Sequence, residues 1–430
     1  MKTYIYPNQS QLAEIIARPV FDNNSLKEKV TAVLQEVKQH GDAAVKKYTK
    51  QFDGVVLETI AITRQEIEEA ETLMPVELQD AIKAAAKNIR IFHEAQIEKS
   101  KVVETQAGVQ CWRKAVGIEK VGLYIPGGTA PLFSTILMLA IPASIAGCRE
   151  IVLCSPPDKN GKLHPAIIYA ANLVGVTKIF KIGGVQAIGA MAYGTETVPK
   201  VYKIFGPGNQ YVTCAKQLVQ EDSVAIDMPA GPSEVCVLTD DSANAVYVAS
   251  DLLSQAEHGV DSQAILITTS KDLLEKVQVE VEKQLNDLPR KSIAEKALEH
   301  SNLILVKSIE DAIKTANEYA SEHLILSCKN AEEVAEKIIN AGSVFIGNYS
   351  PESVGDYASG TNHTLPTNGY AHAYSGVGVD SFVKMITFQK LTQQGLRQIA
   401  KTVTTMAEAE GLIAHKNAVK YRMENTENRS

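Results

Sequence analysis

Cysteines are few in this sequence, and none of them belongs to a recognisable motif. Six cysteines are scattered along 430 residues, and no two are spaced as CxxC. A disulfide framework or a thiolate metal site needs closely spaced cysteines, whereas isolated reduced thiols are typical of the cytosol. We therefore expect a cytoplasmic protein whose cysteines are free and have no catalytic role.

Basic runs and uninterrupted apolar runs are also absent. The net charge is −7 and no arginine-rich stretch occurs, which disfavours a nucleic-acid partner. Pro131 and Pro142 interrupt the most apolar segment, residues 130–148, so it is predicted to be a buried helix and not a membrane span. The first residues lack the apolar core of a secretory signal. We expect no nucleic acid and no membrane as partners.

The sequence does contain the alternation of helices and strands that is typical of α/β proteins. A chain of 430 residues is too long for one ordinary core, which predicts two or more domains. Residues 20–110 have the apolar spacing of charged, amphipathic helices. Short apolar runs alternate with helices over 121–239 and again over 243–347, which predicts parallel sheets. The predicted fold is α/β: two tandem, incomplete Rossmann-like parallel-sheet domains, a helical N-terminal layer and a helical C-terminal tail.

Three glycine turns follow predicted strands and precede predicted helices. They are YIPGGTAP at 124–131, IGGVQAIGA at 182–190 and FGPGNQ at 205–210, and no GxGxxG motif follows the first strand. Backbone N–H groups at such turns can bind a phosphate, although a single glycine turn usually only reverses the chain. Three turns at one edge of one sheet indicate a dinucleotide site.

Separate segments of the chain contain nitrogen and oxygen donors. Gln255 and His258 are three residues apart in SQAEHG, so they share one face of a helix. Taken alone, this pair fits a polar helix end capped by glycine better than a metal site. Further donors are Asp356 and His363 in GDYASGTNH, and Glu410 and His415 in AEGLIAHKN. A donor set without thiolate is typical of a catalytic zinc and not of a closed structural one.

Glu322 and His323 are adjacent at the predicted end of the helix NEYASEH. Neighbouring residues on a helix do not face each other, so we expect them to flank a cleft and not to pair. Histidine suits proton removal from an alcohol near neutral pH, and glutamate can activate a water molecule. A Glu–His dipeptide alone is usually an inconsequential surface feature.

Eight motifs resemble those of histidinol dehydrogenases, in order from Val121 to Val419. They are VGLYIPGGTAPLFST, GGVQAIGA, FGPGNQYV, DMPAGPSEV, LLSQAEHG, ASEHL, GDYASGTNHTLPT and EGLIAHKNAV. The resemblance implies a zinc- and NAD-dependent oxidation of L-histidinol to L-histidine by way of L-histidinaldehyde, the final steps of histidine biosynthesis.

The resemblance also implies roles for individual residues. The implied zinc ligands, which would also contact the substrate, are Gln255, His258, Asp356 and His415. The other implied substrate contacts are Ser233, His323, His363 and Glu410. The implied NAD contacts are Tyr124, Gln186 and Asn209. The implied catalytic acid–base pair is Glu322 and His323.

The domain boundaries follow from the patterns and the resemblance together. We expect an N-terminal arm, 1–20, that packs with the tail, and a helical C-terminal dimerisation tail, 376–430. A first α/β domain would combine 21–120 with 235–375, and a second, NAD-binding domain would span 121–234. The resemblance implies a homodimer with an exchanged tail, in which His415 would complete the site of the partner.

Three alternatives remain open. A relative with the same NAD-binding fold could oxidise another small alcohol, such as a sulfonated diol, although His363 and Glu410 suit the imidazole and ammonium groups of histidinol. A zinc hydrolase could use Glu322 to activate water on an amide or ester, but the glycine turns disfavour it. A catalytically silent metal-binding protein would not need an acid–base pair.

Overall fold

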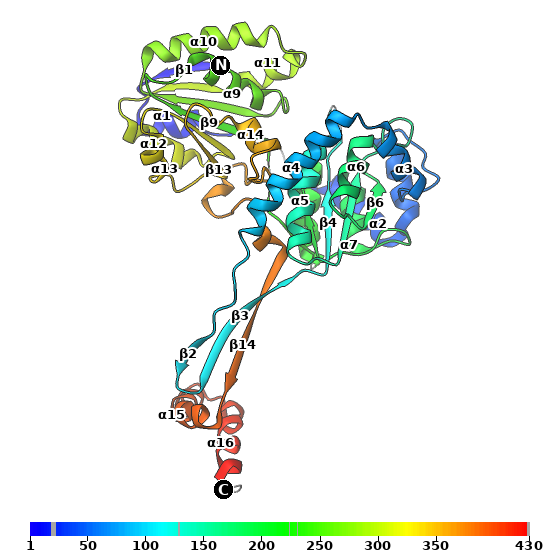
Figure 1. Cartoon of the computed structure of the whole chain (residues 1–430), viewed down its shortest axis with the longest axis vertical. Helices are drawn as coiled ribbons and strands as arrows, with labels where there is room; N and C mark the ends of the chain where they lie inside the picture. The colour runs from blue at the N-terminus through cyan, green and yellow to red at the C-terminus, as the bar shows by residue number, and fades with distance from the viewer. Residues whose placement is uncertain (19–22, 128–129, 223, 230, 428–430) are drawn as a thin grey trace. The chain divides into compact units, whose positions relative to one another are not determined.

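The computed structural model describes residues 1–18, 23–127, 130–222, 224–229 and 231–427 (Figure 1). The chain forms two compact units. The first contains Met1–Gln96 and Ile118–Phe382, and the second contains Ile97–Gly117 and Val383–Ser430. Two parallel sheets lie in the first unit, which confirms the predicted tandem α/β fold.

The smaller sheet of the first unit has five parallel strands in the order β6-β5-β4-β7-β8. Its strands are β4 (Lys120–Tyr124), β5 (Glu150–Ser155), β6 (Lys178–Lys181), β7 (Lys203–Phe205) and β8 (Ala225–Ile226). Because helices cover both faces of a parallel sheet, its strands are nearly continuous apolar runs, as the fully buried segment Val152–Cys154 shows. The predicted glycine turns follow β4, β6 and β7, so their strands end at one edge. Residues 128 and 129 of the first turn lie outside the described part of the chain.

Helices cover both faces of this sheet (Figure 1). They are α2 (Asn23–Phe52), α3 (Arg64–Leu73), α4 (Val76–Glu94), α5 (Phe133–Ile145), α6 (Pro165–Leu173), α7 (Gly184–Tyr193) and α8 (Gln210–Val219), followed by η1 (Gln220–Asp222). One core contains α3 to α6, and the other contains α2, α7 and α8. The helical layer was predicted to share a domain with residues 235–375. This prediction is wrong, because the apolar faces of α2 and α4 are buried against α7 and α5.

The larger sheet has six parallel strands in the order β1-β11-β10-β9-β12-β13. Its strands are β1 (Lys2–Ile5), β9 (Glu234–Thr239), β10 (Gln263–Thr268), β11 (Asn302–Leu305), β12 (His323–Ser327) and β13 (Ser343–Ile346). Its helices are α1 (Gln9–Ile15), α9 (Ala245–Ala256), α10 (Lys271–Leu285), α11 (Lys291–Glu299), α12 (Ile309–Tyr319) and α13 (Ala331–Ala335). Apart from β1, both sheets have the same strand order, which confirms the tandem repeat of the architecture.

The N-terminal segment belongs to this larger sheet. β1 pairs in parallel with β11 at the sheet edge, and Leu12 and Ile15 of α1 join the core beneath it. Within the chain, residues 1–16 are therefore part of a sheet domain and not a separate arm. That this segment packs with the tail stays a prediction.

The turn-rich stretch after β13 contains short helical segments. They are α14 (Glu352–Tyr357), η2 (Tyr370–His372) and η3 (Val379–Phe382). Several of its side chains are buried, among them Asn362, Thr364 and Thr367. A long loop held by buried polar residues is usually functional, and this one carries two of the predicted site residues.

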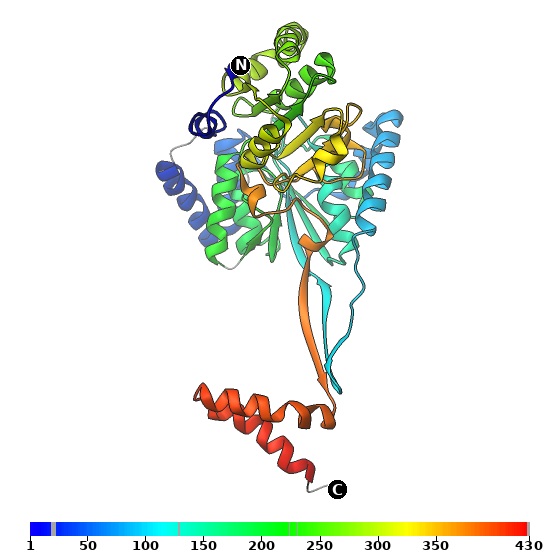
Figure 2. The ribbon, with the colours of Figure 1, turned by 90° about the vertical axis from the view of Figure 1, so that its left-hand side faces the viewer.

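The second unit is an antiparallel ribbon followed by two helices. The ribbon has the strand order β14-β3-β2, formed by β2 (Val103–Gln106), β3 (Val109–Gly117) and β14 (Val383–Leu391). Figure 2 shows β3 and β14 side by side, followed by α15 (Gln393–Ala409) and α16 (Ile413–Glu427), which pack together. The predicted helical tail, 376–430, therefore contains two helices and also one strand that the sequence did not predict. The β-branched and aromatic residues of β14 favour a strand once β3 supplies a partner.

The apolar segment at 130–148 forms α5, as predicted. Among the described residues, no helix is both long enough and apolar enough to cross a membrane.

Candidate active site

A small pocket lies where the end of β7 meets the starts of β9 and β12. Its volume is about 40 Å³, which holds a few water molecules at most. It is lined by Gly206, Pro207, Asp227, Met228, Gly231, Ser233, Glu322, His363, Thr364, Leu365 and Thr367. Three residues predicted from the sequence, Ser233, Glu322 and His363, therefore share one pocket. A substrate larger than water must displace part of this lining.

A buried ion pair shapes the glycine turn at one side of the pocket. Lys216 on α8 pairs with Asp227, and both side chains are almost fully buried. Lys216 Nζ donates to Gly206 O (2.8 Å), and Gly206 N donates to Asp227 Oδ2 (2.8 Å). Gly206 has φ 122°, and a Cβ there would lie 2.0 Å from Tyr124 O, so only glycine lets β7 and β4 approach at this point.

Three potential metal ligands converge next to His323. One ligand atom each from His258, Glu352 and Asp356 lies within 4.8 Å of the others. His258 follows α9, whereas Glu352 and Asp356 are four residues apart on α14, so both carboxylates share one helical face. Imidazole nitrogen and carboxylate oxygen are ligands that zinc accepts. Oε2 of Glu352 is buried and has no hydrogen-bond partner in the part of the chain that the structure describes.

Gln255 lies against this cluster. Its amide oxygen faces two other acceptors, and its nitrogen reaches Glu352 Oε1 (3.1 Å) and Glu234 O (3.3 Å) only when the amide is turned over. An oxygen surrounded by acceptors is unfavourable. Either a bound cation offsets this, or the amide is turned so that its nitrogen faces the two acceptors. Together with the carboxylates and His258, this amide forms a donor set that fits a zinc ion.

Glu322 and His323 enter the same cluster from the start of β12. Nδ1 of His323 lies 3.7 Å from Glu322 Oε2 and 3.8 Å from Glu352 Oε1, and its Nε2 lies 3.5 Å from Asp356 Oδ1. The expectation that Glu322 and His323 lie on a helix and do not pair is wrong. α12 ends at Tyr319, and the bend between Tyr319 and β12 lets both side chains meet.

The pKa values of these groups reflect the crowding of negative charge. Burial raises the pKa of Glu322 to about 8, and burial also raises the pKa of Glu352 to about 8. Burial lowers the pKa of His323, but the neighbouring carboxylates of Glu352, Glu322 and Asp356 outweigh it and raise this pKa to about 10. The carboxylates thus lie where a positive neighbour is needed. A protonated His323 or a bound cation meets this need.

His363 connects the cluster to the smaller sheet. Its Nδ1 lies 2.9 Å from Asp356 O, and its Nε2 lies 3.1 Å from Thr135 Oγ1 on α5. The ring is therefore held between the long loop and a helix of the other sheet. This position beside the pocket fits the predicted substrate contact.

Sequence reasoning missed Glu352. Its side chain is 1% exposed and touches the group formed by His258 and Asp356. The sequence signal was its spacing, because Glu352 precedes Asp356 by one helical turn in PESVGDY. The turn-rich sequence predicts a loop here, and the spacing of residues has no helical meaning in a loop.

Glu410 and His415 lie in the second unit. Glu410 caps the end of α15, His415 lies on α16, and both are exposed. Their roles in the site stay predictions.

The three predicted NAD contacts lie at the edge where β4, β6 and β7 end. Tyr124 Oη accepts a hydrogen bond from Gly184 N (3.1 Å). Gln186 is fully buried in the first turn of α7, and its Oε1 has no hydrogen-bond partner among the described residues. Asn209 caps α8 and is exposed. Asp53, which the sequence did not single out, lies 3.5 Å from Gln186 Nε2 through its Oδ2.

Asp53 has a pH-dependent cost to stability. Burial raises the pKa of its carboxyl from 3.8 to about 6, so the folded state disfavours the charged form. The stabilisation by the protonated form is complete below pH 3.8 and is lost as pH rises through 6. We expect Asp53→Asn to raise the free energy of unfolding at pH 8 by about 1 kcal/mol, after allowance for solvent screening at this half-buried group.

Urea denaturation at pH 5 and pH 8 measures this effect, and the gain should be smaller at pH 5. Asp158→Asn is a control of opposite sign. Burial raises the pKa of the Asp158 carboxyl, but hydrogen bonds from Lys162 N and Asn160 N together outweigh burial and lower this pKa. A loss of stability in Asp53→Asn at pH 8 would contradict the prediction.

Known proteins match this chain over nearly its whole length. The sequence model of the histidinol dehydrogenase family matches residues 16–423. Histidinol dehydrogenase of Bacteroides thetaiotaomicron is 62% identical over 423 residues, which cover 98% of this chain and 99% of that protein. The Haemophilus influenzae protein of the same name is 51% identical over 426 residues, which cover 98% and 99%. The crystal structure of histidinol dehydrogenase from Elizabethkingia anophelis superposes with a TM-score of 0.97, at 55% identity and 99% coverage of both chains. The chain therefore belongs to the histidinol dehydrogenase family and is a zinc- and NAD-dependent oxidoreductase of histidine biosynthesis.

Proposed function

We propose that this enzyme oxidises L-histidinol to L-histidine in two steps, with L-histidinaldehyde as the intermediate and one NAD consumed in each step. The observation that carries the proposal is the convergence of His323 and Glu322 on the cluster of His258, Glu352 and Asp356. A base, a second carboxylate and a set of metal ligands at one point are what successive alcohol and aldehyde oxidations require.

Gln255, His258 and Asp356 would hold the zinc ion, with His415 as the fourth protein ligand. When bound, zinc supplies a positive centre that holds the amino and imidazole nitrogens of histidinol and orients its carbinol carbon. Glu352 lies against both Gln255 and His323. Its buried carboxylate therefore contributes negative charge on the protein side of this site.

Where a cation neutralises the neighbouring carboxylates, His323 can be neutral. His323 then removes the hydroxyl proton of histidinol as a hydride leaves the carbinol carbon for NAD, which gives the aldehyde and NADH. Glu322 then activates a water molecule, which adds to the aldehyde carbonyl. His323 takes the proton of the resulting diol as a second hydride leaves for a second NAD, and histidine is released. His323 is placed for this role because its two ring nitrogens are within 4 Å of three carboxylates, which can accept or return its proton.

Ser233 and His363 would contact the substrate from the pocket wall, and Glu410 would contact its ammonium or imidazole group. Tyr124, Gln186 and Asn209 would contact NAD at the edge where the strands end. The unpartnered Oε1 of Gln186 supports this assignment, because a buried amide oxygen without a donor is costly unless a ligand supplies one.

We further propose a cytoplasmic homodimer with an exchanged tail, in which His415 and Glu410 complete the site of the partner. Free cysteines agree with a reducing compartment. Apolar side chains are exposed on the second unit, including Met406, Leu412, Ile413 and Tyr421. These residues lie on α15, on α16 and in the turn between them, and exposed apolar residues gathered in one region mark a surface for association.

The first experiment follows NADH formation by its near-ultraviolet absorbance. With L-histidinol and NAD, we expect NADH from the native protein, its loss after removal of metal by a chelator, and its return with zinc. Two NADH per histidinol at completion are expected, because both oxidations occur on one enzyme. Absence of NADH from fully metallated protein would contradict the proposal and favour another alcohol, and hydrolysis of an ester without NAD would favour a zinc hydrolase.

A further inference from the structure

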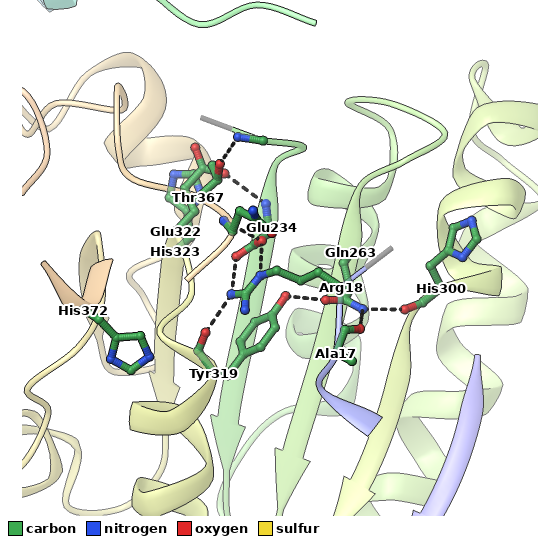
Figure 3. A network of polar contacts seen from close by, with 12 residues as sticks. Ala17, Arg18, Glu234, Gln263, His300, Tyr319, Glu322, His323, Thr367 and His372 are labelled. Carbon is green, nitrogen blue, oxygen red and sulfur yellow. Dashed lines mark hydrogen bonds and ion pairs between the residues drawn. The ribbon is translucent and has the colours of Figure 1, made fainter. Parts of the chain in front are cut away.

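A buried ion pair lies beside the active site and takes no part in the steps above. Arg18, which follows α1, donates from Nε to Glu234 Oε1 (2.5 Å) and from Nη2 to Glu234 Oε2 (2.8 Å). Figure 3 shows the guanidinium pointing at this carboxylate. The side chain of Glu234 is 3% exposed and that of Arg18 is 18% exposed. Two parallel hydrogen bonds fix the orientation of both groups, not only their distance.

Arg18 is held on its other sides by Tyr319, the last residue of α12. Nη2 donates to Tyr319 O (2.6 Å), and the guanidinium carbon lies 4.3 Å from the centre of the tyrosine ring. The hydroxyl of Tyr319 in turn donates to Gln263 Oε1 (2.8 Å). The ion pair therefore joins the end of α1, the end of α12 and the start of β9 in one rigid network (Figure 3).

Glu234 also contacts Glu322, the carboxylate proposed to activate water. Its backbone N–H donates to Glu322 Oε2 (2.9 Å). Its Oε1 also accepts a hydrogen bond from Asn368 N (2.8 Å), within the turn-rich stretch that carries His363. Asn368 follows Thr367, which accepts from Gly231 N. Glu234 thus helps to position both Glu322 and the turn-rich stretch that carries His363.

Stability alone is a weak explanation for this ion pair. Burying two charges costs desolvation energy that their attraction repays only in part, and well-packed apolar side chains often serve as well. What a bidentate arginine–carboxylate pair adds is geometry. Here the ion pair fixes Glu234. The N–H of Glu234 donates the one main-chain hydrogen bond that the Glu322 carboxylate accepts among the described residues.

We propose that Arg18, acting through Glu234, is a positioning residue that holds Glu322 for activation of water on the aldehyde. The inference rests on the proposed role of Glu322. Without the guanidinium, the buried Glu234 carboxylate loses its positive partner. Either this carboxylate takes up a proton, or the start of β9 shifts. Glu322 then loses its fixed partner. Aldehyde oxidation, which needs this carboxylate at a defined distance from carbon, slows more than alcohol oxidation, which needs His323.

The test compares Arg18→Met and Arg18→Lys with the native zinc enzyme. Oxidation of supplied L-histidinaldehyde is measured separately from the first NADH formed in a single turnover with L-histidinol. We expect Arg18→Met to slow aldehyde oxidation about 10- to 100-fold, as a misplaced group does, and to change the first step less than about 3-fold on the same argument. Arg18→Lys should restore part of the aldehyde rate, because it returns the charge without the paired hydrogen bonds.

Two controls separate the inference from general loss of stability and from the proposed function. Ile304→Ala, in the core of β11, destabilises the same sheet and should leave the ratio of the two steps unchanged. Glu322→Gln should slow aldehyde oxidation. If Glu322→Gln leaves that step unchanged, the proposed role of Glu322 fails, and the inference fails with it.

If Glu322→Gln slows aldehyde oxidation while folded Arg18→Met slows both steps equally or neither, only the inference fails. Should Arg18→Met not fold, the comparison is made with Arg18→Lys and Glu234→Gln. An unchanged ratio of the two steps in both variants overturns the inference in the same way.

Discussion

His323→Ala lowers the rate of NADH formation from L-histidinol by about 10²- to 10⁴-fold, the range that general base catalysis contributes. The imidazole is 4% exposed and lies within 4 Å of the carboxylates of Glu322, Glu352 and Asp356. Alanine removes the imidazole, and the carboxylates that remain would have to take the hydroxyl proton from a greater distance. Because the base acts in both oxidations, both steps slow. Stopped-flow absorbance with histidinol and with histidinaldehyde measures each step separately.

Glu322→Ala gives a different pattern in the same experiment. The first oxidation continues and the aldehyde oxidation slows, because only the second step needs an activated water molecule. His40→Ala, which removes an exposed histidine of α2, is the matched control and should retain the native rates. If either His323→Ala or Glu322→Ala leaves both oxidations unchanged, that residue has no part in catalysis.

Asp356→Ala releases the metal and abolishes NADH formation. Asp356 lies where the ligand atoms of His258 and Glu352 converge, so its loss removes one proposed ligand. It also removes the carboxylate that lies 3.5 Å from Nε2 of His323. We expect the zinc content after dialysis to fall from about one ion per chain to a small fraction, and the residual activity to match that of chelator-treated enzyme. Metal analysis by plasma mass spectrometry, made alongside the rate, tests both parts.

Glu352→Gln distinguishes a ligand from a supporting group at the same site. A side chain that orients a ligand costs about 10- to 100-fold in metal affinity when it is changed. We therefore expect Glu352→Gln to bind zinc more weakly but still to recover activity at high zinc concentration, unlike Asp356→Ala. Glu257→Gln makes the same charge change next to His258 and should bind zinc normally. Full zinc occupancy in dialysed Asp356→Ala would contradict the assignment of Asp356.

Much of the architecture could be predicted because local periodicity reports it. Parallel strands buried on both faces are short apolar runs, and the sequence predicts most of them in both sheets. β1 and β8 are not among the predicted strands, because β1 is an edge strand with mostly exposed side chains and β8 is two residues long. The packing of the helical layer could not be found in this way. α2 and α4 each have one apolar stripe, but a stripe does not say which of two similar sheets it covers, and the structure shows that it is the smaller sheet.

The residues of the candidate site show the same limit of sequence reasoning. Motif resemblance named Gln255, His258, Asp356, Glu322 and His323, and the structure brings them into one cluster. Glu352 was overlooked because its helix is six residues long, too short for a helical period to be visible in a turn-rich sequence. Arg18 and Glu234 are 216 residues apart, and no local pattern connects them.

By itself, the sequence determined the alternation of strands and helices, the glycine turns and the chemical types of the donors, because these depend on neighbouring residues. Only the tertiary structure decided which donors meet. Lys216 and Asp227 shape a turn, the bend before β12 turns Glu322 toward His323, and α14 brings Glu352 to Asp356. The reason is physical: a hydrogen bond or a metal site depends on distances of a few ångströms in space, and the packing of distant segments sets those distances.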